Sequence, residues 1–196
     1  MKNTFLQTLK LTLICIVCFS GIYTAVIYGV AQVMPNRGKG EIISANGKTY
    51  YANIGQQFKS EGYFVGRPSA VAYNAASSGG SNKGPSNPEY LADVQKRIDT
   101  IFSKNPSVAK KDIPAEMVTA SASGLDPDIS VLSAKLQMKR IARVHNIKVS
   151  ELETLIENHT DKPLLGLFGP EKINVLKLNI ALDQIVQLNY KHIQTN

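Results

Sequence analysis

The residues best suited to covalent catalysis are two serines and three histidines. Ser121 and Ser123 lie in the stretch TASASGLDP, and the histidines are His145, His159 and His192. A serine hydrolase needs a hydroxyl that a histidine activates while a carboxylate orients that histidine. The chain lacks the G-x-S-x-G pattern that places such a serine on a sharp turn. Because a triad is defined by geometry, the sequence leaves a hydrolase open as one hypothesis.

A phosphate-binding loop is a second chemistry to consider, in the Gly- and Ser-rich residues 62–91. A Walker A loop needs G-x-x-x-x-G-K-[ST], because its Lys reaches the outer phosphates and its hydroxyl holds magnesium. Here GGSNKG is followed by Pro85, so the Lys is misplaced and a needed N–H is missing. The stretch also carries large side chains that require burial, Tyr63, Phe64, Val65 and Tyr73. We therefore expect an ordered, turn-rich segment instead of a nucleotide site or a linker.

Metal and acid–base chemistry are not indicated for this chain. The three histidines have no metal-ligand spacing, and Cys15 and Cys18 lie inside an apolar run, where buried thiols are expected. Asp126 and Asp128 flank Pro127 just before a predicted helix. We expect these two carboxylates to cap that helix.

An apolar run near the start of the chain predicts a membrane helix over residues 11–34. The segment 11–36 contains no charged residue and no histidine. As a helix, residues 11–34 measure about 36 Å, enough to cross a bilayer core of about 30 Å. A cleaved signal peptide is the alternative, but its apolar core is usually only about 7–15 residues long. Lys and Arg flank both ends of the run, so their count leaves the orientation open.

Small residues recur every four positions along this predicted helix, at Gly21, Ala25 and Gly29. They therefore share one face, and small side chains let a second membrane helix approach closely. We interpret this face as a helix–helix interface. The alternative is an ordinary distribution of Gly and Ala in a membrane helix.

The rest of the chain predicts a compact α+β domain. A hairpin is expected around Asn46-Gly47, a strand or extended segment at residues 116–123, and a strand at residues 173–179. Helices are expected at residues 87–102, about 128–145, 149–160 and after Asn179, with end signals that include Asn87 and a Ser150/Glu153 capping box. No βαβ rhythm is visible. No basic run with interleaved aromatic residues occurs, so nucleic acid is not an expected partner.

Apolar periodicity also assigns the inner faces of two helices. In the second helix, one face consists of Val131, Ala134, Met138, Ile141 and Ala142, and Lys135, Lys139 and Arg143 lie opposite. In the last helix, Leu182, Ile185 and Val186 are expected to point inward.

Five ordered stretches carry a resemblance to a known family. EGYFVGRPSA, SGGSNKGPSNP, VTASASGLDPDIS, HTDKPLLGLFG and INVLKLNIALD follow one N-terminal apolar span. Together they resemble the C subunit of the bacterial Kdp complex, an ATP-driven high-affinity potassium pump. The resemblance covers nearly the whole chain.

The resemblance implies a non-catalytic accessory subunit in the cell membrane, and the D-K-T-G-T phosphorylation motif is indeed absent from the sequence. Its partners would be a channel-like potassium-binding subunit, a P-type ATPase subunit, a small single-span subunit and membrane lipid. The implied topology is a cytoplasmic tail (residues 1–10), a membrane helix (11–34) and an extracytoplasmic domain (35–196). ATP and potassium would act on the complex, with no cofactor assigned to this chain.

The family is also described as a catalytic chaperone that raises the ATP affinity of the ATPase subunit. A glutamine of the second helix is proposed there to contact nucleotide, and Gln137 matches it; a buried structural amide is the alternative. The Gly/Ser-rich segment would form a surface against the channel-like subunit, with Arg67, Ser81, Asn82 and Asn87 as candidate contacts. Asp128 and Val131 stand where the family usually has His and Pro, so any role of that His is in doubt. A membrane-anchored extracytoplasmic hydrolase remains the alternative function.

Overall fold

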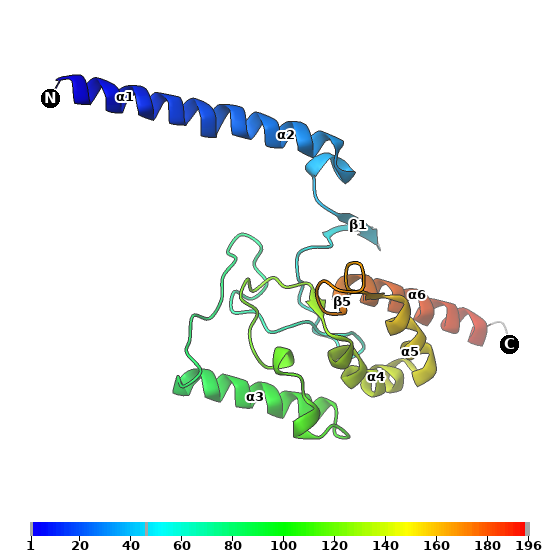
Figure 1. The fold of residues 1–196 in the computed structure, drawn as a ribbon. Coiled ribbons are helices and arrows are strands. Elements are labelled where there is room, and N and C mark those ends of the chain that lie inside the picture. The colour runs from blue at the N-terminus through cyan, green and yellow to red at the C-terminus, as the bar shows by residue number, and fades with distance from the viewer. Residues whose placement is uncertain (1, 46, 195–196) are drawn as a thin grey trace. The chain divides into compact units, whose positions relative to one another are not determined.

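The computed structural model describes residues 2–45 and 47–194 and divides the chain into two compact units (Figure 1). These units are Met1–Tyr51 and Ala52–Asn196. The predicted mixed α+β fold with one N-terminal membrane-length helix is confirmed. The expected boundary between membrane helix and outer domain at residues 34 and 35 stays a prediction.

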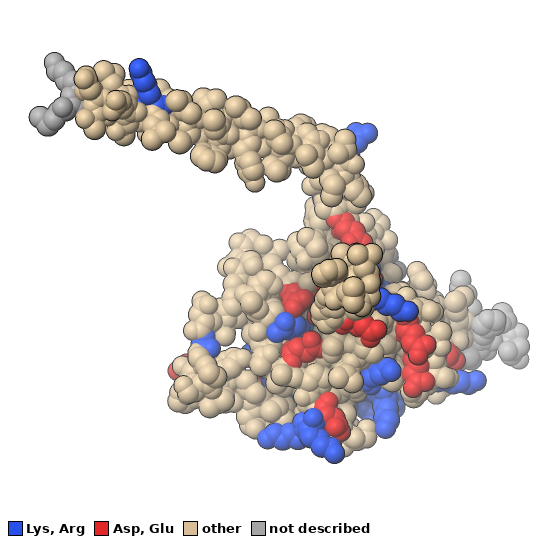
Figure 2. All heavy atoms as spheres, in the orientation of Figure 1, with Lys and Arg blue, Asp and Glu red and all other residues tan. Residues whose placement is uncertain are grey.

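The first unit begins with a long helix built from three consecutive pieces. α1 (Lys2–Ile16) leads into one π-helical stretch, η1 (Val17–Ile22), and then into α2 (Tyr23–Val33). In η1 the N–H of Tyr23 donates to the carbonyl of Cys18, five residues back. The stretch Asn3–Val33 is long and apolar enough to cross a membrane. Figure 2 shows this rod almost free of charged atoms, as a membrane-spanning helix requires.

A short hairpin completes the first unit. A 3₁₀ turn, η2 (Pro35–Gly38), is followed by β1 (Ile42–Ala45) and β2 (Lys48–Tyr51). The strands pair antiparallel, from Ile42 opposite Tyr51 to Ala45 opposite Lys48, which confirms the predicted hairpin. Gly47 has a φ of +72°, as a tight turn requires, whereas Asn46 lies outside the described residues.

The second unit contains four helices and one small sheet among its described residues. The helices are α3 (Pro88–Lys104), α4 (Val131–His145), α5 (Val149–Asn158) and α6 (Val175–Gln194), with 3₁₀ turns η3 (Lys110–Asp112) and η4 (Ala115–Met117). The sheet has the antiparallel order β3-β5-β4, from β3 (Asp128–Ile129), β5 (Lys172–Asn174) and β4 (Thr160–Asp161).

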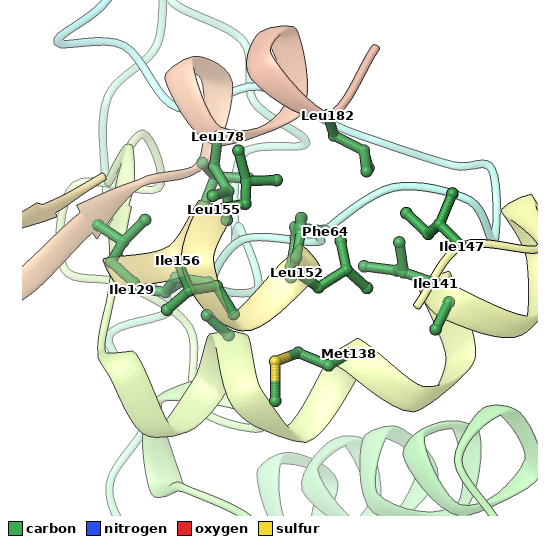
Figure 3. Close-up of a cluster of buried hydrophobic side chains, with 14 residues drawn as sticks. Phe64, Ile129, Met138, Ile141, Ile147, Leu152, Leu155, Ile156, Leu178 and Leu182 are labelled. Carbon is green, nitrogen blue, oxygen red and sulfur yellow. The ribbon is translucent and has the colours of Figure 1, made fainter. Parts of the chain in front are cut away.

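The main core lies among α4, α5 and α6 and centres on a residue that precedes them all. Phe64 is fully buried, and Figure 3 shows it among side chains from these helices. The predicted faces are confirmed, since Ala134, Met138, Ile141 and Ala142 of α4 and Leu182 of α6 are buried in this cluster, with Val131, Ile185 and Val186 packed against it. A smaller cluster beneath α3 contains Ile101, Met117 and Val118.

Local sequence signals assigned the N-caps of α4 and α5 wrongly. α4 begins at Val131 and not near residue 128, because Ser130 caps it by accepting from the N–H of Ser133. Asp126 and Asp128 therefore do not cap α4. α5 has Lys148 at its N-cap and no side-chain cap bond, so the predicted Ser150/Glu153 capping box is also wrong.

The predicted strands after residue 115 are shorter than expected or absent. The stretch 116–123 forms no strand and begins inside the 3₁₀ turn η4. The stretch 173–179 is strand only up to Asn174, whose side chain accepts from the N–H of Lys177 at 3.0 Å and caps α6. Asn179, predicted as that cap, lies inside α6 and is 2 % exposed. By contrast, the prediction that Asn87 caps α3 is confirmed.

Candidate functional site

The most unusual part of the domain is residues 61–65, which we call the clamped segment. Its five consecutive backbone carbonyls all accept hydrogen bonds from side chains of α4 and α6. Buried backbone groups must find partners, and an extended chain normally finds them in a neighbouring strand. Here side chains of two helices replace that strand.

Two buried amides hold the middle of the clamped segment from opposite sides. Asn179 of α6 accepts from the N–H of Phe64 and donates to its carbonyl, both at 2.9 Å. Gln137 of α4 does the same for Val65, at 2.9 and 3.1 Å. Each amide thus reproduces the pair of hydrogen bonds that a strand would supply. The aromatic ring of Phe64 is thereby fixed in the core.

A buried guanidinium holds the start of the clamped segment. Arg140, 4 % exposed, donates to the carbonyls of Glu61 and Tyr63 and to Oε1 of Gln137. Burial lowers the pKa of the Arg140 guanidinium, and the negative charge of Glu61 offsets part of that effect. The carbonyl of Gly62 accepts from Nε2 of His145 at 2.9 Å. A Cβ at Gly62 would stand 2.6 Å from that nitrogen, so a larger residue there would displace the His145 ring.

A cavity of about 230 Å³ opens beside this cluster, between α3 and α4. Its wall includes Arg97 and Lys104 of α3 together with Gln137 and Arg140 of α4. The residues described as its lining include no Asp or Glu, so the cavity is positively charged. Asn105, also in the wall, has a buried Oδ1 atom without a hydrogen-bond partner among the described residues. This arrangement could accept a small anion or a donor group.

The Gly/Ser-rich segment after residue 66 is ordered by contacts with residues 121–126, as predicted. Ser69 Oγ donates to the carbonyl of Gly124 at 2.6 Å, and the N–H of Gly79 donates to that of Ser123 at 2.8 Å. Tyr73 is half-buried and its hydroxyl donates to the carbonyl of Arg67. Burial raises the pKa of this phenol, and the nearby Arg97 lowers it in part.

The four residues predicted to face a partner lie in different surroundings. Arg67 forms an ion pair with Asp126 at 3.0 Å, and Asn87 accepts from the N–H of Tyr90 at the start of α3. Ser81 and Asn82 are exposed, and Asn82 has a φ of +53°. The structure thus gives the first two residues a role inside the domain, while their contact with a partner stays a prediction.

Two carboxylates near the start of α4 have distinct environments. Asp128 accepts from Nζ of Lys172 at 2.6 Å, and this hydrogen bond raises the pKa of that lysine. Glu116 accepts from the N–H of Ser130 and the hydroxyl of Ser133. Burial raises the pKa of Glu116, but these hydrogen bonds and the charge of Arg67 outweigh it, so the pKa lies below its ordinary value.

The residues considered for hydrolysis are not assembled into a triad among the described side chains. Ser121 is 3 % exposed, whereas Ser123 is exposed. The rings of His145 and His159 each bond a backbone carbonyl, of Gly62 and of Leu155. The side chain of His192 lies outside the described residues. No group of three or more potential metal ligands gathers anywhere in the described part of the chain.

The small-residue face of the membrane-length helix is open. A Cβ added at Gly21 or at Gly29 would meet no atom within 4 Å. Gly21 lies in η1, and Ala25 and Gly29 lie in α2. The face is therefore free for a partner, but its use as an interface stays a prediction.

Comparison with known proteins decides the family. The sequence model described as "KdpC: K+-transporting ATPase, c chain" matches residues 5–184. The potassium-transporting ATPase KdpC subunit of Bacteroides fragilis (strain ATCC 25285) is 54% identical over 187 residues, which cover 93% of this chain and 98% of that protein. The chain belongs to the KdpC family. The KdpC subunit of Flavobacterium psychrophilum is also 54% identical, over 94% of this chain and 100% of that protein.

Membership of the KdpC family confirms the resemblance and does not favour the hydrolase alternative. A KdpC protein is an accessory subunit of a potassium-transporting ATPase. One membrane-length helix in a subunit of this kind indicates a membrane location. The match covers the membrane-length helix and most of the second unit, so both parts belong to the family.

Sequence reasoning missed the most important polar residue of this KdpC chain. Arg140 lies between the exposed cations Lys139 and Arg143, so the sequence suggests that it belongs to a charged surface. Its position three residues after Gln137 and one before Ile141 puts it on the buried side of α4. That spacing, within a face of buried residues, was the available signal.

Proposed function

We propose that this chain is a non-catalytic subunit that assembles and stabilises a potassium-transporting ATPase complex. One observation supports this most strongly: Gln137, Arg140 and Asn179, the large polar side chains of the core, all bind the chain's own backbone. Buried polar groups used in this way rigidify a domain, whereas catalysis needs groups directed at a substrate. A rigid domain on a membrane helix suits a scaffold within a larger assembly.

The proposed assembly contains a channel-like potassium-binding subunit, an ATP-hydrolysing P-type subunit and a small single-span subunit. We place the N-terminus of this chain in the cytoplasm and its domain outside the cell membrane. The absence of charged residues from positions 11–36 supports a membrane crossing, and the family resemblance supports its direction.

Co-purification tests the assembly role. The full chain, tagged at its C-terminus and extracted in mild detergent, should retain the other subunits, and its deletion should abolish growth at low potassium. Isolation of the chain alone, with unchanged growth of the deletion strain, would contradict the proposal. A C-terminal alkaline phosphatase fusion should be active if the domain lies outside, and an inactive fusion would reverse the orientation.

A second candidate function is to raise the ATP affinity of the ATP-hydrolysing subunit, with Gln137 close to nucleotide. The positively charged cavity that Gln137, Arg97 and Lys104 line supports it, because phosphates bind where such charges converge. Two features weigh against direct contact. Gln137 is 1 % exposed and its amide is occupied by Val65 and Ser133, and an outer domain does not meet cytoplasmic ATP.

Nucleotide binding can be separated from folding by variants of the cavity wall. Arg97→Gln with Lys104→Gln removes two charges and leaves the clamped segment intact. If the cavity holds phosphate, the ATP concentration for half-maximal hydrolysis by the complex should rise about tenfold or more, since each charged contact contributes about 1.5–3 kcal/mol. An unchanged ATP dependence in an intact complex would exclude this second function.

A further inference from the structure

The loop between β4 and β5 exposes four large apolar side chains at one tip. Leu164, Leu165, Leu167 and Phe168 are 70%, 81%, 82% and 64% exposed. We call residues 163–168 the apolar loop; it is the short orange loop beside the β5 label in Figure 1. Single exposed apolar residues are common on soluble domains, but a contiguous group of them marks an interaction site.

The apolar loop is a closed turn held by its own backbone. Leu164 and Phe168 exchange two hydrogen bonds of 3.0 Å, and the N–H of Gly166 donates to the carbonyl of Pro163 at 2.9 Å. Such a turn presents its side chains in a fixed arrangement. Little ordering entropy is then lost when a partner covers them.

Leu165 stands in a backbone conformation that disfavours it. Its φ of +56° lies in the left-handed region, where Gly and Asn are the usual residues. The side chain is nearly fully exposed, so it does not compensate for this cost by packing within the domain. Leu165 therefore destabilises its own turn and adds nothing to the core, which points to a contact outside the domain.

The charges beside the apolar loop favour a protein partner over lipid. Asp161 and Lys162 precede it and Glu171 and Lys172 follow it, so the flanks carry no net charge. Loops that dip into a cell membrane gain much of their affinity from Lys and Arg next to anionic headgroups. Lys172 is moreover engaged with Asp128. A neutral surround fits an uncharged, apolar depression on a protein.

We propose that the apolar loop docks into an apolar depression on the outer surface of another subunit of the potassium-transporting complex. This inference rests on the proposed assembly function and names the surface that performs it. Leu165 and Leu167, the two most exposed side chains, act as the anchors.

The decisive experiment couples stability to assembly. Leu165→Asn with Leu167→Gln removes both anchors, while Asn suits the left-handed position. The melting temperature of the full chain in detergent should stay the same or rise by about 2 °C. The amount of partner subunit retained should nevertheless fall about tenfold or more, because the interface loses two leucines that the partner would bury.

Leu132→Gln with Leu188→Gln is the matched control, since both leucines are exposed and belong to α4 and α6, outside the apolar loop. The control should retain its partners. If the wild-type chain retains no partner, the assembly function itself fails. If wild type, control and loop variant all retain partners equally, the assembly function stands and the docking of the loop is wrong.

Cysteine labelling separates a protein partner from lipid. Leu167→Cys in a chain with Cys15→Ala and Cys18→Ala carries one thiol, at the tip of the loop. A water-soluble maleimide should label it about tenfold more slowly in the complex than in the isolated chain in lipid nanodiscs. Equally slow labelling in nanodiscs without partners would assign the loop to lipid and overturn the proposal. Equally fast labelling in both would leave the loop in water and overturn it too.

Discussion

At the scale of single residues, this domain uses polar side chains as substitutes for a strand. Gln137 and Asn179 present their amides to Val65 and Phe64, and Arg140 presents its guanidinium to two further carbonyls. Each of these groups would be costly to bury alone. Together with the clamped segment they are satisfied, so removing any one of them leaves buried carbonyls without donors.

We expect Arg140→Met to destabilise the domain strongly. The part-buried carbonyls of Glu61 and Tyr63 would lose their donor, and an unsatisfied group costs up to about 1–3 kcal/mol when water cannot reach it. The melting temperature of the full chain, followed by circular dichroism in detergent, should fall by roughly 10 °C. Arg143→Met, an exposed neighbour on the same helix, should change it by less than about 2 °C. Equal melting of both variants would show that the guanidinium is dispensable.

Glu116 should make the stability of the domain depend on acid. Its folded pKa lies below the ordinary value of 4.5, so its contribution is complete above that pH and is lost as pH falls through the folded pKa. The melting temperature of Glu116→Gln should therefore lie below that of wild type by a few degrees, about 3 °C, at pH 7. The gap should narrow below pH 4.5. A gap that is constant from pH 7 to pH 3 would rule out the ionised carboxylate as its source.

At the scale of elements, local signals predicted faces well and ends poorly. The sequence predicted the buried faces of α4 and α6 because apolar residues repeat with every helical turn. It predicted the cap at Asn87 because a cap bonds to a residue only three positions away. The ends of α4 and α6 were misplaced because several polar residues compete there and tertiary contacts choose among them. Asn179 was assigned to a cap because its true partner, Phe64, lies 115 residues away. The hydrogen bonds of the clamped segment could not be predicted from the sequence for the same reason.

The junction between residues 55 and 126 should not tolerate a methyl group. The N–H of Gly55 donates to the carbonyl of Leu125 at 2.7 Å, and a Cβ on Gly55 would stand 2.4 Å from the carbonyl oxygen of Asp126. Gly55→Ala should lower the free energy of unfolding by about 1–3 kcal/mol, measured by urea denaturation. Gly84→Ala, where a Cβ meets nothing within 4 Å, is the control and should be nearly neutral. A neutral Gly55→Ala would mean that the junction can open.

At the scale of the whole molecule, the chain combines an almost uncharged rod with a domain whose surface carries both signs of charge (Figure 2). The sequence predicted this membrane-length helix from its hydropathy, because a bilayer excludes charged residues over a fixed length. The apolar loop was not recognised from the sequence. In the sequence its leucines form a short apolar run, and only their exposed fractions in the structure show that the side chains point outward.

The small-residue face of the rod should be needed for assembly. Gly21→Leu with Gly29→Leu would hold a neighbouring helix away, and overpacking costs about 1–3 kcal/mol per site. Retention of the other subunits in detergent should fall at least about tenfold, while the second unit melts as in wild type.

The control for this face is Ile22→Leu with Val26→Leu, elsewhere on the same helix, which should leave retention unchanged. Co-purification of the glycine variant at the control's level would show that this face contacts lipid. Contacts made by the second unit would then hold the complex together.

The clamped segment also determines when the domain can fold during synthesis on the ribosome. Phe64 leaves the ribosome 115 residues before Asn179, a delay of roughly 6–23 s at ordinary rates of synthesis. During that interval the clamped segment lacks the amide of Asn179, and the core lacks the side chains that α6 contributes. The domain can therefore close only when its last helix arrives, and a chain broken off before Asn179 is a target for proteolysis.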